Sequence, residues 1–299
     1  DRIRSRGLGD VYKRQRLSSN RGKLKMKIKS FGKINLNLRV LDEVINGLHK
    51  IESLIIPIDF YDVIEIKEID NDKDIITFDS TDIPDNNTVS KTLDLIRKTN
   101  DFSQYFEINI IKNIPTESGL GGGSSNAGTI ISKLSQTYDL SIPSNKDVAE
   151  KIGSDVPFFI TGKPAFVKGV GDIIEPKTID FEMNMLLVVP KETITTGDAF
   201  FEFDRQGNTS TILDIYNGIE IFNDFWNASS TIEPKLIKVK EYLESTTGER
   251  FFMSGSGSSM FCLGTLENLQ KKIDLIDENQ FRIVKVVKKI DFSLETISD

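Results

Sequence analysis

The stretch ESGLGGGSSNAG, residues 117–128, holds five glycines in one run between two segments with regular periods. Before it, YFEINIIKNIP (105–115) alternates apolar and polar residues, which is typical of a strand. After it, NAGTIISKLSQTYDL (126–140) repeats apolar residues at helical spacing. The glycines therefore lead into the N-terminus of a helix, where backbone N–H groups lack partners and the helix dipole is positive.

This connection predicts a phosphate cradle, because glycine lets the backbone approach an anion closely and adopt positive φ. The hydroxyls of Ser124 and Ser125 add donors or a metal contact. The composition alone also fits a tight, close-packed turn. A P-loop is excluded because no Gly-Lys-Ser/Thr follows the glycines. A Rossmann fingerprint is excluded because Ser124 stands at its third glycine and Asp139 follows a helix rather than a second strand.

Composition narrows the class of protein further. The chain has 299 residues, with one cysteine, Cys262, and one histidine, His49. A single cysteine excludes an intrachain disulfide and suits a reducing compartment, so we expect a cytoplasmic protein. Clusters of His and Cys ligands are not available, which leaves Mg²⁺ held by oxygen atoms as the expected metal. No apolar stretch approaches the length of a membrane span, so we expect no membrane partner.

Residues 1–25 differ from the rest of the chain. They have no regular period and hold nine Lys and Arg against two Asp. An Arg-rich segment is typical of a targeting arm, but DVYKRQ (10–15) looks like one reading frame of a transposase adaptor used in sequencing libraries. We therefore expect Met26 to be the native start and residues 1–25 to be a non-native leader. From Met26 on, 29 Lys and Arg face 43 Asp and Glu, a charge of −14 that argues against nucleic-acid binding.

The remaining strands and helices interleave without a regular βαβ count, which predicts an α+β fold. MKIKSFGKINLNLRVL (26–41) alternates strictly, with Lys33 and Asn35 on its polar face. DNNTVSKTLDLIRKT (85–99) predicts a helix opened by capping residues. The buried strand MNMLLVVP (183–190) opens a second part of the chain near residue 180.

Three motifs, in this order, resemble those of the GHMP kinase superfamily, which is named for galactokinase, homoserine kinase, mevalonate kinase and phosphomevalonate kinase. They are GKINLNLRV (32–40), GLGGGSSNA (119–127) and MSGSGSSMF (253–261). Four further pieces support the resemblance: NGLHKIESL (46–54), DNNTV (85–89), SDVPFFI (154–160) and KGVGDIIEP (168–176). The resemblance implies a two-domain α+β GHMP kinase fold. An N-terminal, ribosomal-S5-like ATP-binding domain is expected over residues 26–179, and a C-terminal, ferredoxin-like α/β domain over 180–299.

The resemblance implies transfer of the γ-phosphoryl group of ATP, with Mg²⁺, to a substrate hydroxyl. It implies Asp155 as the base and Lys33 as its partner. The strand pattern adds that Lys33 and Asn35 point into one cleft, and a lysine there keeps a carboxylate ionised and stabilises the transferring phosphoryl group. Taken alone, Lys33 also fits a solvated strand lysine and Asp155 a turn or capping residue before Pro157.

The resemblance also assigns binding residues. Those implied for the nucleotide are Pro115, Gly119, Leu120, Gly121, Gly122, Gly123, Ser124, Ser125 and Asn126. Those implied for the acceptor substrate are Asn35, Leu48, His49, Phe200, Ser256 and Gly257. The family usually reads Asp-Gly-Tyr-His where this chain has Asn46-Gly47-Leu48-His49. Leu48 covers a cytosine ring by apolar contact but loses a stacking contribution of roughly 1 kcal/mol.

Within the superfamily, the chain most resembles the branch that phosphorylates the 2-hydroxyl of 4-diphosphocytidyl-2-C-methyl-D-erythritol in the non-mevalonate (MEP) route to isoprenoid precursors. We expect this cytidylyl methylerythritol as the small-molecule substrate and a monomer or homodimer. The alternatives are a GHMP kinase of the homoserine or mevalonate type, or a relative that binds nucleotide without catalysis. Retention of both Lys33 and Asp155 argues against the last.

Overall fold

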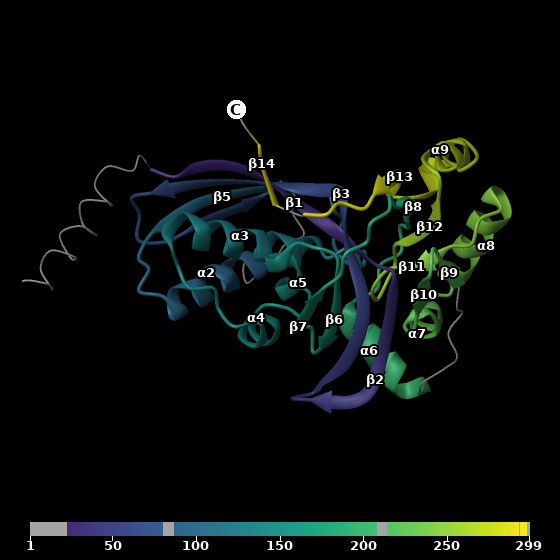
Figure 1. Cartoon of the computed structure of the whole chain (residues 1–299), viewed down its shortest axis with the longest axis horizontal. Helices are drawn as coiled ribbons and strands as arrows, with labels where there is room; N and C mark the ends of the chain where they lie inside the picture. The colour runs from purple at the N-terminus through teal and green to yellow at the C-terminus, as the bar shows by residue number, and fades with distance from the viewer. Residues whose placement is uncertain (1–22, 80–86, 208–213, 293, 298–299) are drawn as a thin grey trace, which may run out of the picture.

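A computed structural model describes residues 23–79, 87–207, 214–292 and 294–297 (Figure 1). Its elements, in chain order, are β1 (Lys25–Asn35), β2 (Asn37–Ile45), β3 (Leu48–Ile69), β4 (Ile75–Phe78), α2 (Thr88–Thr99), β5 (Tyr105–Ile111), α3 (Gly122–Tyr138), α4 (Asn145–Lys151), α5 (Val156–Thr161), β6 (Ala165–Gly169), β7 (Ile173–Pro176), β8 (Asn184–Val189), α6 (Thr196–Gln206), β9 (Asp214–Tyr216), β10 (Ile219–Asn223), α7 (Trp226–Ile232), α8 (Lys235–Thr247), β11 (Phe252–Met253), β12 (Met260–Gly264), α9 (Leu266–Ile273), η1 (Glu278–Gln280), β13 (Ile283–Lys288) and β14 (Leu294–Ile297). Most of the expected leader lies outside the described residues, so its origin stays a prediction.

The large sheet is organised around β3, which is long enough to pair with different strands along its length. Its main path is β14-β1-β3-β2-β10-β9, and β5 and β6 also pair with β3. The predicted strand at 26–41 is observed as two strands, β1 and β2, separated at Leu36. Its apolar face is buried as expected, but Lys33 and Asn35 are also only 3% exposed. At Lys33 and Asn35 the polar face therefore points into the protein, whereas Arg39 on the same face is exposed.

Helices α2, α3, α4 and α5 lie together on one side of the large sheet (Figure 1). The predicted caps are present: Asn87 accepts hydrogen bonds from the N–H groups of Val89 and Ser90 at the start of α2. Apolar residues of α2 and α3 pack on those of β5 in one buried cluster. Gly128 lets α3 approach α5 closely, because a Cβ at this position would lie 2.6 Å from the Cβ of Phe159.

A second, antiparallel sheet has the order β11-β12-β8-β13 and packs with α6, α7, α8 and α9. A further buried cluster joins the two sheets, with Ile34 and Ile56 of the large sheet against Leu187 and Phe261 of the second. The α+β prediction is confirmed. Two segments from beyond residue 180 return to the large sheet, since β10 pairs with β2 and β14 pairs with β1. A domain boundary at 180 stays a prediction.

Among the described residues, no helix combines the length and the apolar character that crossing a bilayer requires.

Candidate active site

The glycine run forms the start of α3. Gly121 adopts the left-handed conformation, with φ of 71°, and the helix begins at Gly122. The first hydrogen bond after this turn runs from the N–H of Ser125 to the carbonyl of Gly121, at 2.8 Å. The N–H groups of Gly122, Gly123 and Ser124 precede it and are free of helical partners, as at any helix N-terminus. The helix therefore begins earlier than the sequence period predicts, and these glycines offer backbone donors to an anion.

The segment 254–259 packs against the residues that lead into this loop and is hydrogen-bonded to them. The Ser259 N–H donates to the carbonyl of Ser118 at 3.1 Å, and the Ser254 hydroxyl donates to the carbonyl of Gly119 at 3.2 Å. A Cβ at Gly119, where φ is +74°, would overlap the carbonyl oxygen of Ser254. The glycine here is therefore required by packing as well as by its backbone conformation.

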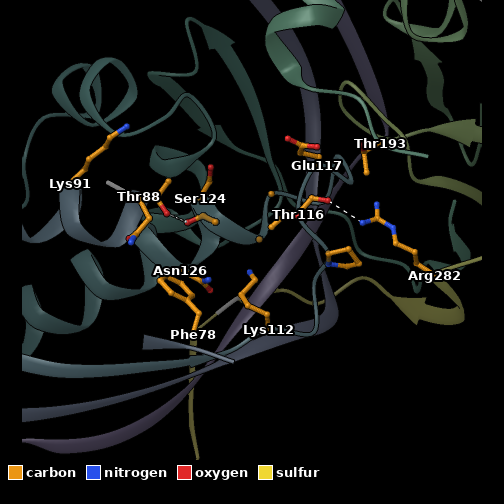
Figure 2. Close-up of a pocket in the computed structure, with 15 residues that line it drawn as sticks. Phe78, Thr88, Lys91, Lys112, Thr116, Glu117, Ser124, Asn126, Thr193 and Arg282 are labelled. Atoms are coloured by element: carbon orange, nitrogen blue, oxygen red, sulfur yellow. Dashed lines mark hydrogen bonds between the residues drawn. The ribbon is translucent and has the colours of Figure 1, made fainter. Parts of the chain in front are cut away.

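A cavity of about 700 Å³ opens over the N-terminus of α3 (Figure 2). Its lining residues are Phe78, Asn87, Thr88, Lys91, Lys112, Pro115, Thr116, Glu117, Gly121, Gly122, Gly123, Ser124, Asn126, Thr193 and Arg282. Asn126 is 1% exposed, and its Oδ1 has no hydrogen-bond partner among the described residues. An acceptor left in this state is costly unless a ligand donates to it. The cavity, which we call the nucleotide pocket, thus combines the aromatic ring of Phe78, backbone N–H donors and cationic side chains.

Three residues predicted for the nucleotide lie outside this lining. Gly119 packs against Ser254, and the carbonyl of Leu120 accepts the N–H of Lys33 at 3.0 Å. The Ser125 hydroxyl donates to the carbonyl of Phe31 at 2.6 Å, so this side chain ties α3 to β1. The expectation that Ser125 adds a donor or metal contact is not supported, because the helix turns its hydroxyl into the core.

The structure adds pocket residues that sequence reasoning missed. Lys112 follows the end of β5, shortly before the glycine run, and forms a buried ion pair with Asp62. Asp62 also accepts hydrogen bonds from the N–H groups of Asn113 and Ile114, both at 2.8 Å. The sequence offers a signal that could have identified Lys112 as a pocket residue, because it stands at the end of the strand that leads into the loop. Lys91 and Arg282 come from distant elements and carry no local pattern.

Lys33 and Asp155 meet beside the loop. The Nζ of Lys33 lies 3.4 Å from the Oδ2 of Asp155, and their side chains are 3% and 28% exposed. Lys33 also donates to the Oδ1 of Asn35, whose Nδ2 donates to the Ser53 hydroxyl at 2.8 Å. Asp155 precedes α5, yet its side chain makes no capping hydrogen bond within the described residues. Its carboxylate is thus held by Lys33 and remains open to a ligand.

A second cavity of about 300 Å³, the acceptor pocket, is lined by residues from distant segments. They are Gly47, Leu48, His49, Ile51, Ser154, Val170, Gly197, Phe200 and Asp204. Three predicted substrate residues, Leu48, His49 and Phe200, therefore come together here. The His49 and Phe200 rings stack at 5.7 Å between centroids, with 11° between their planes.

Asp204 is a member of the acceptor pocket that sequence reasoning missed. The His49 Nε2 lies 2.7 Å from the Oδ1 of Asp204, and the His49 Nδ1 lies 2.9 Å from the carbonyl of Leu41. Both neighbours are acceptors, and the tautomer of the ring decides which nitrogen donates. The ring is thereby fixed in orientation. Asp204 lies on α6, and on this helix two hydrogen bonds lower the pKa of Glu202 to about 2. The bond from Arg205 contributes most and the bond from Gln206 comes next.

The other predicted substrate residues lie around these pockets. Asn35 is buried beneath Lys33, as described above. The Ser256 hydroxyl lies 3.1 Å from that of Thr196, the first residue of α6. Gly257 packs against the side chain of Met253, and its carbonyl faces Gly119. These two residues connect the glycine loop to the helix that carries Phe200.

The Lys33–Asp155 pair adjoins a residue of each pocket, although neither side chain belongs to either lining. Gly121 lines the nucleotide pocket, and a Cβ on it would lie 3.2 Å from the Cγ of Lys33. Ser154 lines the acceptor pocket and directly precedes Asp155 in the chain. Lys33 and Asp155 are thus each adjacent to a residue that lines one of the two pockets.

Comparison with known proteins identifies a kinase of the GHMP class: residues 87–163 match the family model "GHMP kinases N terminal domain", and curated relatives that cover most of the chain are named kinases. A 4-diphosphocytidyl-2-C-methyl-D-erythritol kinase of Azobacteroides pseudotrichonymphae is 35% identical over 247 residues, which cover 77% of this chain and 90% of the relative. One of Chlorobium phaeobacteroides is 31% identical over 280 residues, 86% of this chain and 93% of the relative. The chain belongs to the 4-diphosphocytidyl-2-C-methyl-D-erythritol kinase family.

Solved structures agree on the fold. A crystal structure of 4-(cytidine 5'-diphospho)-2C-methyl-D-erythritol kinase superposes with a TM-score of 0.69 at 21% identity, over 88% of this chain and 98% of that one. Homoserine kinase from Cytophaga hutchinsonii superposes with a TM-score of 0.57 at 17% identity, over 91% and 97% of the two chains.

Proposed function

We propose that this protein transfers the γ-phosphoryl group of ATP to the 2-hydroxyl of 4-diphosphocytidyl-2-C-methyl-D-erythritol, a step toward isoprenoid precursors. The observation that carries the proposal is that Lys33 and Asp155, 3.4 Å apart, each adjoin a residue of a different pocket: Gly121 of the pocket over the helix N-terminus, and Ser154 of the smaller apolar pocket. ATP occupies the first pocket with its phosphates on the amides of Gly122–Ser124. The cytidylyl group occupies the second, against Phe200 and His49.

In this arrangement Asp155 accepts the proton of the acceptor hydroxyl as its oxygen bonds to the γ-phosphorus. The bond from that phosphorus to the β–γ bridging oxygen breaks, and ADP leaves. Lys33, held by Asn35, lies beside Asp155 and stabilises the charge on the transferring group. The two pockets supply the positioning on which phosphoryl transfer mainly depends.

Mg²⁺ fits the nucleotide pocket as a metal held largely by phosphate and water. Ser124 and Glu117 line the pocket and provide a hydroxyl and a carboxylate, which are ligand types that Mg²⁺ accepts. No group of three or more His, Cys, Asp or Glu side chains within the described part of the chain is arranged to hold a metal unaided. When bound with ATP, Mg²⁺ neutralises developing phosphate charge.

The cellular context follows the same reasoning. We propose a cytoplasmic enzyme with no nucleic-acid partner, since the chain from Met26 on is acidic and has a single, buried cysteine. We propose that it works as a monomer or homodimer. Light scattering on the purified chain measures this last point, and a larger assembly would contradict it.

The test of the proposed function is ADP release from ATP and Mg²⁺ with a panel of acceptors: the cytidylyl substrate, homoserine and mevalonate. We expect turnover with the cytidylyl substrate only. Turnover with homoserine or mevalonate alone would show that the protein has another activity of the GHMP kinases. Nucleotide binding without turnover on any acceptor would make it a non-catalytic relative.

A further inference from the structure

Arg282 reaches the nucleotide pocket from the second sheet, immediately before β13. Its Nε donates to the carbonyl of Pro190 at 2.9 Å, and its Nη1 donates to the carbonyl of Thr116 at 3.3 Å. Thr116 stands shortly before the glycine run. Figure 2 shows the guanidinium pointing at Thr116 across the pocket from Phe78, Thr88 and Lys91. One side chain thus links the second sheet to the edge of the phosphate-binding loop.

This guanidinium is incompletely satisfied. Its Nη2 is buried and has no hydrogen-bond partner within the described residues, and Arg282 forms no ion pair there within 4.0 Å. Loss of water on burial lowers the pKa of Arg282, although the charges of Glu117 and Glu192 oppose this. Arg282 as a whole is only half-buried, but a buried N–H of a cation without an acceptor is unfavourable, and an anion in the pocket would compensate the charge. The site therefore suits a ligand with negative charge.

The other cations of the pocket are placed differently. Lys112 is neutralised by its buried ion pair with Asp62, so its charge is already compensated. Lys91 lies on α2, on the far side of the pocket in Figure 2, with Phe78 and Thr88. Arg282 lies on the side of Glu117 and Thr193, beyond the N-terminus of α3. Phosphates that rest on the amides of Gly122–Ser124 would have Arg282 on this side.

We propose that Arg282 is a nucleotide-binding residue supplied by the second sheet, which contacts the phosphate chain of ATP. This inference rests on the proposed function only in that the pocket takes ATP. Arginine suits the role because its fork carries five N–H groups, so that it can hold two protein carbonyls and still donate to a phosphate. Nucleotide binding then also fastens the second sheet to the glycine loop.

The test uses the full chain and calorimetric binding of adenosine, AMP, ADP and a non-hydrolysable ATP analogue. In Arg282→Ala, we expect adenosine affinity to stay within about 2-fold of wild type. The loss should grow with the number of phosphates, to about 10- to 100-fold for the ATP analogue, as for lost hydrogen bonds to a charged group. Arg282→Lys should show a smaller loss of the same pattern, and it replaces the alanine variant if that variant does not fold. Lys285→Ala, on β13 three residues after Arg282 and outside the pocket lining, is the matched control and should bind all four ligands like wild type.

An equal loss for adenosine and the ATP analogue would overturn the proposal, because Arg282 would then only support the pocket wall. Unchanged affinity for the ATP analogue in both Arg282 variants would overturn it as well. The experiment needs no acceptor substrate. A phosphate-dependent loss in a protein that phosphorylates no acceptor would therefore leave this inference standing while the proposed function fails. Wild type that bound none of the four ligands would contradict both.

Discussion

The nucleotide pocket and the acceptor pocket are built in different ways. Much of the nucleotide pocket is lined by residues of one stretch of chain, 115–117, 121–124 and 126, and its main anion donors are backbone groups. The acceptor pocket is assembled from the β2–β3 hairpin, Ser154 and α6, and its character comes from the side chains of His49, Phe200 and Asp204. A backbone site depends on glycine at fixed positions, whereas a side-chain site depends on the fold that brings distant residues together. Lys33 and Asp155 serve both, so substitutions should separate into three classes.

The largest expected effect is at the shared pair. Asp155→Asn removes the proton acceptor but keeps the shape, so turnover should fall about 10²- to 10⁴-fold. Binding of an ATP analogue should change little, because Asp155 does not line the nucleotide pocket. Steady-state ADP release and calorimetry measure the two quantities. Asp147→Asn, an exposed aspartate on α4, is the control, and turnover of Asp155→Asn equal to that of this control would remove Asp155 from the mechanism.

The second prediction compares a glycine of the loop before α3 with a glycine of the acceptor pocket. Gly119 and Gly47 have similar φ values, +74° and +79°, but a Cβ would overlap Ser254 at Gly119 and meet nothing within 4 Å at Gly47 among the described residues. Gly47→Ala should cost about 1–2 kcal/mol from the left-handed backbone alone. Gly119→Ala should cost about 1–3 kcal/mol more from the overlap. Urea unfolding measures both, and equal losses would show that the loop is not clamped as described.

The sequence predicts the backbone site better than the side-chain site. The strand, the glycine run and the helix of the nucleotide pocket follow one another, so local periods define them. Ser124 lines the pocket, whereas the Ser125 hydroxyl bonds to Phe31, and the sequence could not separate the two because its period does not fix the start of α3. Lys33 and Asp155 were found only through motifs far apart in the chain. Asp204 and Arg282 were missed because an isolated charge has no local pattern, and only tertiary structure places it.

The third prediction concerns Asp204, which fixes the orientation of His49 in the acceptor pocket. Asp204→Ala should raise the KM for the cytidylyl substrate about 5- to 10-fold, as for a lost charged hydrogen bond in a partly exposed site. The KM for ATP should not change, since Asp204 lies outside the nucleotide pocket. Asp204→Asn keeps an acceptor and should retain more of the affinity. Parallel increases in both KM values would mean that the variant disturbs the fold instead.

The fourth prediction refines the acceptor pocket at Leu48, which is 42% exposed. Leu48→Tyr supplies an aromatic face opposite Phe200 and should lower the KM for the cytidylyl substrate about 2- to 10-fold, from roughly 0.5–1.5 kcal/mol of ring contact. Substrate titrations at saturating ATP measure the change. A higher KM in this variant would show that the cytosine does not lie between positions 48 and 200.

The smallest expected effect is on pH-dependent stability of α6. The pKa of Glu202 is lowered from 4.5 to about 2 by hydrogen bonds from Arg205 and Gln206. Its ionised form therefore stabilises the fold above about pH 4.5, and this contribution is lost as pH falls toward 2. Glu202→Gln should melt slightly below wild type at pH 7, and the difference should vanish at acid pH. A difference in Tm that stays constant with pH would assign the effect to packing.

The most direct measurement of the central claim is a crystal structure with a non-hydrolysable ATP analogue and the cytidylyl substrate bound together. The account predicts that the γ-phosphorus and the acceptor 2-hydroxyl meet beside Lys33 and Asp155, with the triphosphate on Gly122–Ser124 and the cytosine against Phe200. A triphosphate directed away from Lys33, or a cytosine in the pocket of Phe78 and Asn126, would contradict it.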